Sequence, residues 1–459
     1  MMPLFKVVGT LRVPFAKVTP TAHGVCLLLR PAACEPGEIE TCRHGQIPGA
    51  VTNGGRGCYC STMRWSNPIV ALLLLAALHA LVDTFALFTQ PLWPTFEKRF
   101  ATDAATIPLA FVAWNMTNSA SQLLFGYWGD RYQGRWLLWL GPLLGILCIC
   151  GIGLVQSSLG LIALLMVGGL GIAAFHPEAA ALAGRLTPEH RSRAMSIFAV
   201  GGYLGQAMGP YYSGEMTTRH GMTALTWSAS WGLIVLALLI SGIWRASAVD
   251  HQVRTDPVSL RRLLQGRYGS VSLLLTVGVL RVITSVGVPM ALAFVIDAQG
   301  GTPAETGHVQ SGYQLGIGLG SIACAALVSA RNERLALWLT PMLSTPLLWL
   351  ACDSVGAARI AYMTAAGTAM GGAFPVLISY GQQLLPEGPR VASSLTMGVT
   401  WGFGSLIVAG VMAVLGSQGH AEWAVYTFAT GALASSLLCW FLPNLHHRQE
   451  VSAAQEAAA

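Results

Sequence analysis

Charge is scarce in this chain of 459 residues. Asp, Glu, Lys and Arg together make up 10% of it, and 53% of the residues are hydrophobic. A soluble domain needs far more charge than this to cover its surface. The composition therefore excludes an ordinary soluble protein. The net charge of +6 is interpreted below as membrane topology, and no nucleic-acid partner is expected.

Motifs of the common enzyme chemistries are absent as well. The sequence contains no Walker A loop, so transport driven by ATP is disfavoured. It also lacks HExxH, GxSxG and CxxC motifs and any dinucleotide-binding loop with an acidic partner. We therefore expect a protein that is not an enzyme and that needs no cofactor or metal.

Long apolar runs fill most of the chain instead. A helix needs roughly 20 apolar residues to cross the hydrocarbon core. Outer-membrane strands would show alternation over about 10 residues, and that pattern is absent. The prediction is an all-α membrane protein with twelve transmembrane helices. They lie at approximately 69–93, 106–128, 136–156, 158–183, 194–216, 222–244, 270–297, 307–330, 335–354, 357–385, 391–416 and 421–443.

The distribution of basic residues predicts the orientation. With both termini in the cytoplasm, the inner loops and the C-terminal tail hold fourteen arginines. The outer loops then hold only Lys98, Arg99, Arg219 and Arg359. By the positive-inside rule, we expect a multi-pass protein of the plasma (inner) membrane with cytoplasmic termini.

The first 62 residues differ from the rest and show no helical or strand periodicity. They hold five of the ten cysteines, and we expect an unstructured extension. Three interpretations stay open: a mis-assigned start with Met63 as the true first residue, a disordered tail, or a cysteine-rich metal or redox segment. The absence of a CxxC pair disfavours the last of these.

An internal repeat divides the apolar runs six and six. At a spacing of 198 residues, Pro91 coincides with Pro289 and Pro177 with Pro375. Parallel repeats of this kind characterise one class of transporters. We therefore predict two pseudo-symmetric six-helix bundles. The expected parts are an extension (1–62), an N-terminal bundle (63–244), a cytoplasmic linker (245–269), a C-terminal bundle (270–445) and a cytoplasmic tail (446–459).

Polar residues deep in the apolar spans mark candidate functional positions. A charge at the bilayer centre costs about 2.5–3.5 kcal/mol, so it normally faces a cavity or a partner. His79 and Asp83 are four residues apart and share one helix face, which suits proton exchange. The repeat places Asp83 opposite Arg281, which predicts an ion pair or an anion contact across the substrate path. A static buried pair is the alternative.

A second polar group surrounds a proline in the fourth span. Pro177 leaves one carbonyl without its usual donor and permits a kink, and Pro375 repeats this in the second half. His176 and Glu178 flank Pro177. They either restore backbone hydrogen bonds or line the translocation path.

Two further motifs concern helix packing and the inner membrane surface. Small residues recur in the fifth span at Gly205, Gly209 and Gly214 beside Pro210, and this spacing lets helix backbones pack closely. Residues 126–135 form a compact block of glycine, acid and base between two apolar runs, which predicts a tight turn at the membrane surface.

The 126–135 block resembles the loop between helices 2 and 3 of the major facilitator superfamily. In that family the loop latches the two bundles together in one conformational state. The resemblance assigns this role to Gly126, Asp130, Arg131, Gly134 and Arg135. One extra residue precedes Gly134, Trp136 replaces a second base, and the copy in the second half has lost most of the pattern.

The fifth-span glycines resemble the helix 5 signature of antiporters in the same superfamily. Three stretches resemble its fosmidomycin-resistance branch more narrowly: His79-Ala-Leu-Val-Asp83, Ala174-Phe-His-Pro-Glu178 and Ala373-Phe-Pro-Val-Leu-Ile-Ser-Tyr380. The resemblance implies alternating access and proton-coupled export of a small molecule by a monomer in the lipid bilayer. A proton-coupled uptake symporter and a non-transporting membrane sensor are the alternatives.

Overall fold

The computed structural model describes residues 67–444, except 102, 104, 133–135, 188–190, 247–259, 330–331 and 417–418. The expectations for residues 1–62 and 446–459 lie outside the described residues. Most of the expected 245–269 linker does so as well. The domain boundaries therefore remain predictions.

The first half of the described chain is a set of helices that begins after Asn67. The side chain of Asn67 accepts hydrogen bonds from the amides of Ile69 and Val70, and Pro68 occupies the first helical position. Short 3-10 or π-helical segments connect or extend several of these helices. The helices are α1 (Pro68–Ala86), α2 (Trp93–Phe100), α3 (Thr106–Asn115), α4 (Ser121–Tyr132), α5 (Leu137–Gly151), α6 (Ser158–Leu186), α7 (Arg191–His220) and α8 (Ser228–Ala246).

The second half repeats this arrangement. Its helices are α9 (Leu260–Leu264), α10 (Tyr268–Ala298), α11 (Pro303–Leu327), α12 (Glu333–Asp353), α13 (Gly356–Gly371), α14 (Ala373–Leu384), α15 (Pro389–Ser394), α16 (Thr400–Val411) and α17 (Ala421–Cys439). Among the described residues there is no β-strand. The predicted all-α membrane fold is therefore confirmed.

The repeat of 198 residues is visible in the helix boundaries. Helix α6 covers residues 158–186, and α13 with α14 covers 356–384. The two copies differ at Gly372, where the second copy is interrupted, while α6 runs unbroken through Pro177. Pro375 cannot donate to the carbonyl of Gly371, and the hydroxyl of Ser321 donates to it instead at 2.8 Å.

Eight helical segments within the described residues are long and apolar enough to cross a membrane. Helices also occupy the other predicted places, but α3–α4, α7, α11 and α17 do not meet that criterion. Helices α7 and α11 pack closely against each other. The count of twelve spans is thus confirmed only in part.

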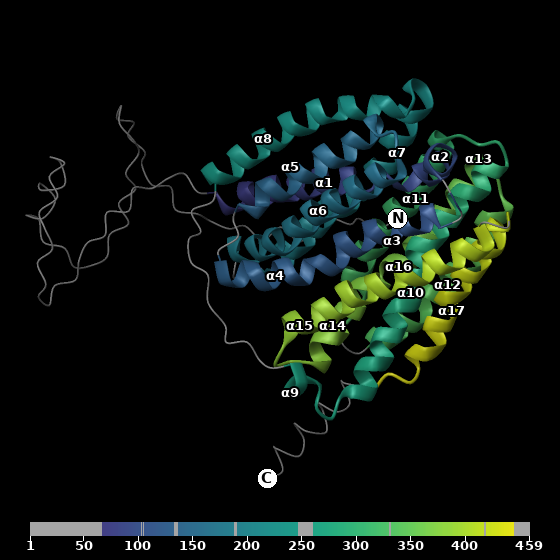
Figure 1. Ribbon diagram of the computed structural model, residues 1–459. Helices are drawn as coiled ribbons and strands as arrows, with labels where there is room; N and C mark the ends of the chain where they lie inside the picture. The colour runs from purple at the N-terminus through teal and green to yellow at the C-terminus, as the bar shows by residue number, and fades with distance from the viewer. Residues whose placement is uncertain are drawn as a thin grey trace, which may run out of the picture. The chain divides into compact units, whose positions relative to one another are not determined.

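Contacts between the two halves run mainly along α7 and α11, with further packing of α3 on α16 (Figure 1). The helices approach closely at two glycines. A Cβ atom added at Gly214 would lie 2.4 Å from the carbonyl oxygen of Pro303, and one added at Gly307 would lie 2.3 Å from that of Pro210. Only glycine permits backbones to approach to this distance.

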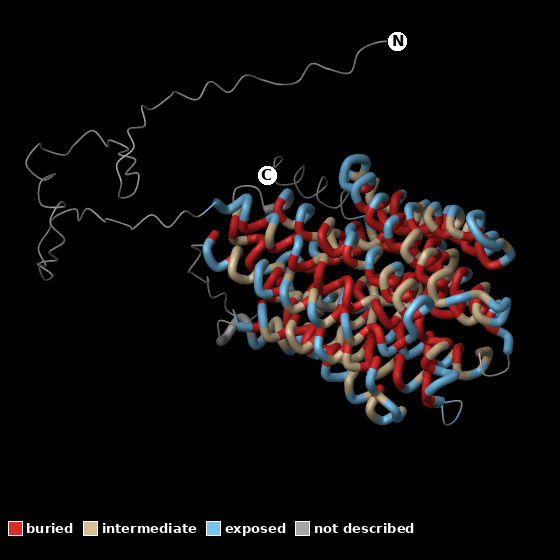
Figure 2. Tube along the Cα trace, turned by 90° about the horizontal axis from the view of Figure 1, so that it is seen from above, coloured by how far each residue is buried: buried red, intermediate tan, exposed pale blue. Residues whose placement is uncertain are grey.

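Several polar contacts also join the halves at one end of the helices, which we call the outer end because the arginine pattern predicts that it faces outside. Lys98 of α2 pairs with Asp297 of α10. Glu215 of α7 pairs with His308 of α11, with Nε2 and Oε1 2.8 Å apart. Buried residues fill the interior of the helical body, and exposed residues lie at its surface (Figure 2).

Candidate functional site

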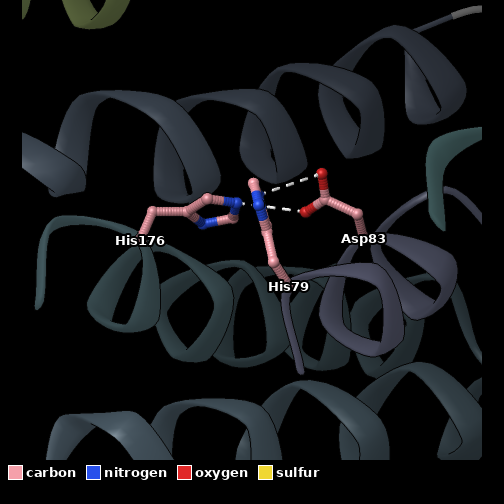
Figure 3. Close-up of side chains that lie close together, drawn as sticks. All are labelled: His79, Asp83 and His176. Carbon is pink, nitrogen blue, oxygen red and sulfur yellow. Dashed lines mark hydrogen bonds and ion pairs between the residues drawn. The ribbon is translucent and has the colours of Figure 1, made fainter. Parts of the chain in front are cut away.

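A buried polar cluster lies inside the first half of the molecule. It consists of His79 and Asp83 on α1 and His176 on α6 (Figure 3). The Nε2 atom of His176 lies 3.1 Å from Oδ1 of Asp83, and Nε2 of His79 lies 3.5 Å from Oδ2. The side chain of Asp83 is 5% exposed and that of His176 is 22% exposed. His176 is thus the most accessible member of the cluster.

Helix α7 completes the cluster from a third side. The side-chain amide of Gln206 donates to Oδ2 of Asp83 at 2.9 Å. The ring of Phe198 stacks on His79 with centroids 4.1 Å apart. The carboxylate of Asp83 therefore receives hydrogen-bonding or ionic contacts from three helices, which fixes its position.

Backbone carbonyls orient both imidazole rings. The Nδ1 atom of His79 lies 2.8 Å from the carbonyl oxygen of Phe198. The Nδ1 atom of His176 lies 2.9 Å from that of Ile172. Because of these contacts, the Nε2 atoms of both rings face Asp83. His176 therefore contacts the backbone of its own helix at Ile172 through one ring nitrogen and Asp83 through the other. Its place on a translocation path stays a prediction.

Close packing of α1 against α7 holds these groups together. A Cβ atom added at Gly205 would lie 2.2 Å from the carbonyl oxygen of Ala80. One added at Gly209 would lie 2.4 Å from that of Thr84. The expected packing role of these fifth-span glycines is confirmed. Gly214, the last glycine of the motif, packs against α11 and not against α1.

The cluster also contains the kinds of atoms that ligate metals. Its donor atoms lie within 4.8 Å of one another. Ligands of a tetrahedral zinc ion, bound at about 2.0–2.1 Å, lie about 3.4 Å apart. The contacts of 3.1 Å from His176 and 3.5 Å from His79 to Asp83 are close to this spacing, and the 3.1 Å contact also has the length of a hydrogen bond. The geometry therefore suits shared protons and does not by itself decide between protons and a metal ion.

Glu178 is not part of the cluster. It follows His176 by two residues, which places the two side chains on different faces of α6. Its carboxylate is buried and lies 3.3 Å from Nη2 of Arg185, one to two turns further along the same helix. The structure thus separates two residues that the sequence grouped together.

Arg281 is not paired with Asp83 in the described structure, so the predicted ion pair is corrected. Arg281 is fully buried in the second half, where it donates to the carbonyls of Leu337 and Ala373. Pro341 lies four residues after Leu337 and leaves that carbonyl without its helical donor. Arg281 therefore satisfies the Leu337 carbonyl that Pro341 leaves without a helical donor, and it has no exposed surface to offer a substrate.

The structure describes only part of the predicted latch loop. Gly126 lies in α4 with Asp130 and Arg131, whose side chains are outside the described residues, as are Gly134 and Arg135 entirely. A Cβ atom added at Gly126 would lie 3.7 Å from that of Pro177, an ordinary contact. Close helix approach therefore does not require glycine at this position.

Gln206 and Phe198 are the site residues that the sequence interpretation missed. Gln206 carries no charge, so it does not stand out as an ionisable residue in an apolar span does. The sequence signal that could have revealed Gln206 is its place as a polar side chain between Gly205 and Gly209. Phe198 gave no signal, because its backbone carbonyl and ring act only through the fold.

These features define a class of protein. The chain has a multi-pass helical membrane fold, two repeated halves that meet along α7 and α11, and a buried cluster of ionisable groups beside that contact. Such an arrangement is that of a membrane transporter.

Comparison with known proteins shows what the chain is similar to. The model of the Major Facilitator Superfamily matches residues 72–263. The fosmidomycin resistance protein of Escherichia coli (strain K12) is 22% identical over 413 residues, which cover 85% of this chain and 97% of that protein. An uncharacterised MFS-type transporter of Bacillus subtilis (strain 168), YfnC, is 27% identical over 177 residues, or 38% of this chain and 43% of that protein.

A solved structure shows the same fold. The crystal structure of the nucleoside transporter NupG matches with a TM-score of 0.66 and 11% identity, over 82% of this chain and all of that one. Residues 72–263 thus match the Major Facilitator Superfamily, and the chain as a whole is similar to the fosmidomycin resistance protein.

Proposed function

We propose that this protein is a secondary active transporter that works by alternating access and exports a small molecule in exchange for protons. It acts as a monomer in the plasma (inner) membrane, with both termini in the cytoplasm. The observation that carries the proposal is the buried carboxylate of Asp83 between His79 and His176. A carboxylate and imidazoles in contact inside a membrane protein form a place where protons bind and leave.

Helix α7 connects this site to the contact between the two halves. Gln206 on α7 holds Asp83. One turn earlier on the same helix, Tyr203 packs against Gly318 of α11, where an added Cβ atom would lie 3.0 Å from that of Tyr203. A change of charge on Asp83 alters the hydrogen bond with Gln206, and α7 passes that change to α11. Proton binding thereby biases how the halves meet, which coupled transport requires.

Export is favoured over uptake by two independent features. The chain is similar to a protein named for drug resistance, and its fifth span carries the antiporter-like glycines. The 126–135 loop, with Gly126, Asp130, Arg131, Gly134 and Arg135, is proposed as the inner latch of the transport cycle.

Asp83→Asn tests the proposal in proteoliposomes with an imposed pH gradient, using fosmidomycin as the first probe within a panel of toxic compounds. We expect the variant to insert normally and to lose proton-driven flux, because its amide cannot release a proton at neutral pH. The matched control is Asp353→Asn, since Asp353 is an exposed carboxylate at the end of α12. It should transport like the wild type.

The direction of flux separates the alternatives. Protection of a drug-sensitive host supports export, whereas increased sensitivity that depends on the chain supports a symporter for uptake. Absence of flux for every compound, with a correctly inserted wild-type protein, supports a sensor. Normal gradient-driven flux by Asp83→Asn would contradict the role of Asp83.

A further inference from the structure

The two imidazole rings of the cluster have a fixed hydrogen-bonding pattern. A backbone carbonyl oxygen only accepts hydrogen bonds. The contacts of 2.8 Å from His79 to Phe198 and 2.9 Å from His176 to Ile172 therefore require a hydrogen on Nδ1 of each ring. A neutral imidazole carries one hydrogen, so neither neutral ring has one on Nε2.

Both Nε2 atoms nevertheless point at the same carboxylate. The two distances to Asp83 are 3.1 Å for His176 and 3.5 Å for His79. An unprotonated Nε2 and an ionised carboxylate are both acceptors, and two acceptors at 3.1 Å repel each other without a hydrogen between them. At least the His176 contact thus needs an additional proton, and the His79 contact provides a second place for one.

We infer that the cluster binds two exchangeable protons, one between Asp83 and each imidazole Nε2, with both rings held in the Nδ1–H tautomer. The inference deepens the proposed function and rests on it for the role of these protons in transport. The net charge of the three side chains passes from −1 with no added proton through 0 to +1 with two. His176 takes the first proton because its contact is the shorter one.

No other ionisable side chain competes for this role among the described residues around the cluster. The remaining groups that act on Asp83 are Gln206, which donates to Oδ2, and Tyr203, both on α7. Glu178 on α6 pairs with Arg185. Gln206 always donates, so it stabilises the ionised carboxylate without contributing an exchangeable proton.

Nitrogen NMR of the full chain in detergent, labelled with 15N-histidine, tests the inference without a transport substrate. The chemical shifts of the two ring nitrogens distinguish both neutral tautomers and the imidazolium. We expect His79 and His176 to show the Nδ1–H tautomer at high pH and both to become imidazolium as the pH is lowered. The resonances are assigned with His79→Gln and His176→Gln, and His308 at the outer end is the control residue.

Two results would overturn the inference. One is the Nε2–H tautomer in either ring at high pH. The other is a single imidazolium at low pH while the second ring stays neutral. Either result would be visible in the wild-type spectrum once the two peaks are assigned. The variants serve only for assignment, so a variant that folds poorly does not leave the tautomer and protonation of the rings undecided.

Asp83→Asn provides a second measurement. The side-chain amide that this substitution introduces donates to one Nε2, so we expect both rings to become harder to protonate, while the His308 resonance stays unchanged. Unchanged titration of both rings would contradict the shared carboxylate. If the spectra follow the expectation but transport is not driven by protons, only the proposed function fails. If transport is driven by protons but the spectra do not follow the expectation, only the two-proton inference fails.

Discussion

Gly202 is the residue whose lack of a side chain leaves room for the contact between His79 and Asp83. A Cβ atom placed there would lie 2.5 Å from Cε1 and 2.8 Å from Nε2 of His79, and 3.1 Å from Oδ2 of Asp83. Those atoms belong to the end of a side chain, so the ring has to swing aside. A side chain at position 202 would therefore disturb the geometry of the cluster more than it would disturb the fold.

Gly202→Ala should reduce proton-driven transport, because the displaced His79 ring loses its contacts with Phe198 and Asp83. The cost in stability should stay within about 1–3 kcal/mol, typical of an added methyl group in a packed interior. Thermal unfolding in detergent and flux in proteoliposomes measure the two effects. Gly410→Ala is the control, because a Cβ atom at Gly410 meets no heavy atom within 4 Å. Equal behaviour of the two variants would refute the role of Gly202.

Arg281 and Asp83 should behave as independent residues. Arg281→Met leaves the carbonyl of Leu337 without a donor, at about 1–3 kcal/mol for a buried group left unpaired. In a double-mutant cycle with Asp83→Asn, the effects on thermal stability should add within about 0.5 kcal/mol. A larger coupling energy would show that the two charges interact, as the repeat in the sequence had predicted.

At the scale of elements, α7 is the helix that touches most functional parts. It packs on α1 through Gly205 and Gly209, holds Asp83 through Gln206, and meets α11 through Gly214. Its polar composition prevents it from meeting the criterion for an apolar span. The small and polar residues that lower the hydropathy of α7 are thus the ones that its contacts with α1, Asp83 and α11 require.

An ion pair ties the start of α10 to the turn between α14 and α15. Arg267 binds Glu387 through two hydrogen bonds of 2.6 and 2.9 Å. This pairing lowers the pKa of the Glu387 carboxyl from 4.5 to about 2. A carboxyl whose pKa is lower in the folded state stabilises that state above its unfolded pKa, and the effect is lost as the pH falls through the folded pKa.

The stability difference between the wild type and Glu387→Gln should therefore depend on pH. We expect the wild type to melt at a slightly higher temperature above about pH 5, and the difference to shrink as the pH falls from 4.5 towards 2. Both residues are partly or largely exposed, so the effect is small. Melting curves across this range check it, and a difference that is constant with pH would contradict the ion pair.

At the scale of the molecule, the proposed alternating access requires the outer-end contacts to break before a substrate can reach that side. Lys98 and Asp297 face each other from the two halves. Cysteines at both positions, joined by a short reducible cross-linker, should stop transport by holding the halves together, and reduction should restore it. Flux of the probe in proteoliposomes measures this.

The control for the cross-link is a pair within one half. Asp353 of α12 and Tyr426 of α17 are hydrogen bonded to each other. Cysteines at these positions, joined by the same reagent, should leave transport nearly unchanged. Continued flux through the cross-linked Lys98–Asp297 pair would show that the outer end does not open during transport.

The sequence by itself determined the class of protein and its plan. Scarce charge, long apolar runs and prolines repeated at 198 residues require a helical membrane protein with two similar halves, because these signals are local or periodic. His79 and Asp83 were also found this way, since ionisable residues in an apolar span are rare.

Only the tertiary structure decided which polar groups meet. It brought His176 and Gln206 to Asp83 from other helices, and it placed Arg281 among carbonyls of its own half. Spacing along one chain fixes contacts within a helix, whereas contacts between helices depend on how each helix is rotated about its axis. That rotation is set by packing at glycines such as Gly205 and Gly209 and by the backbone groups that prolines leave unpaired.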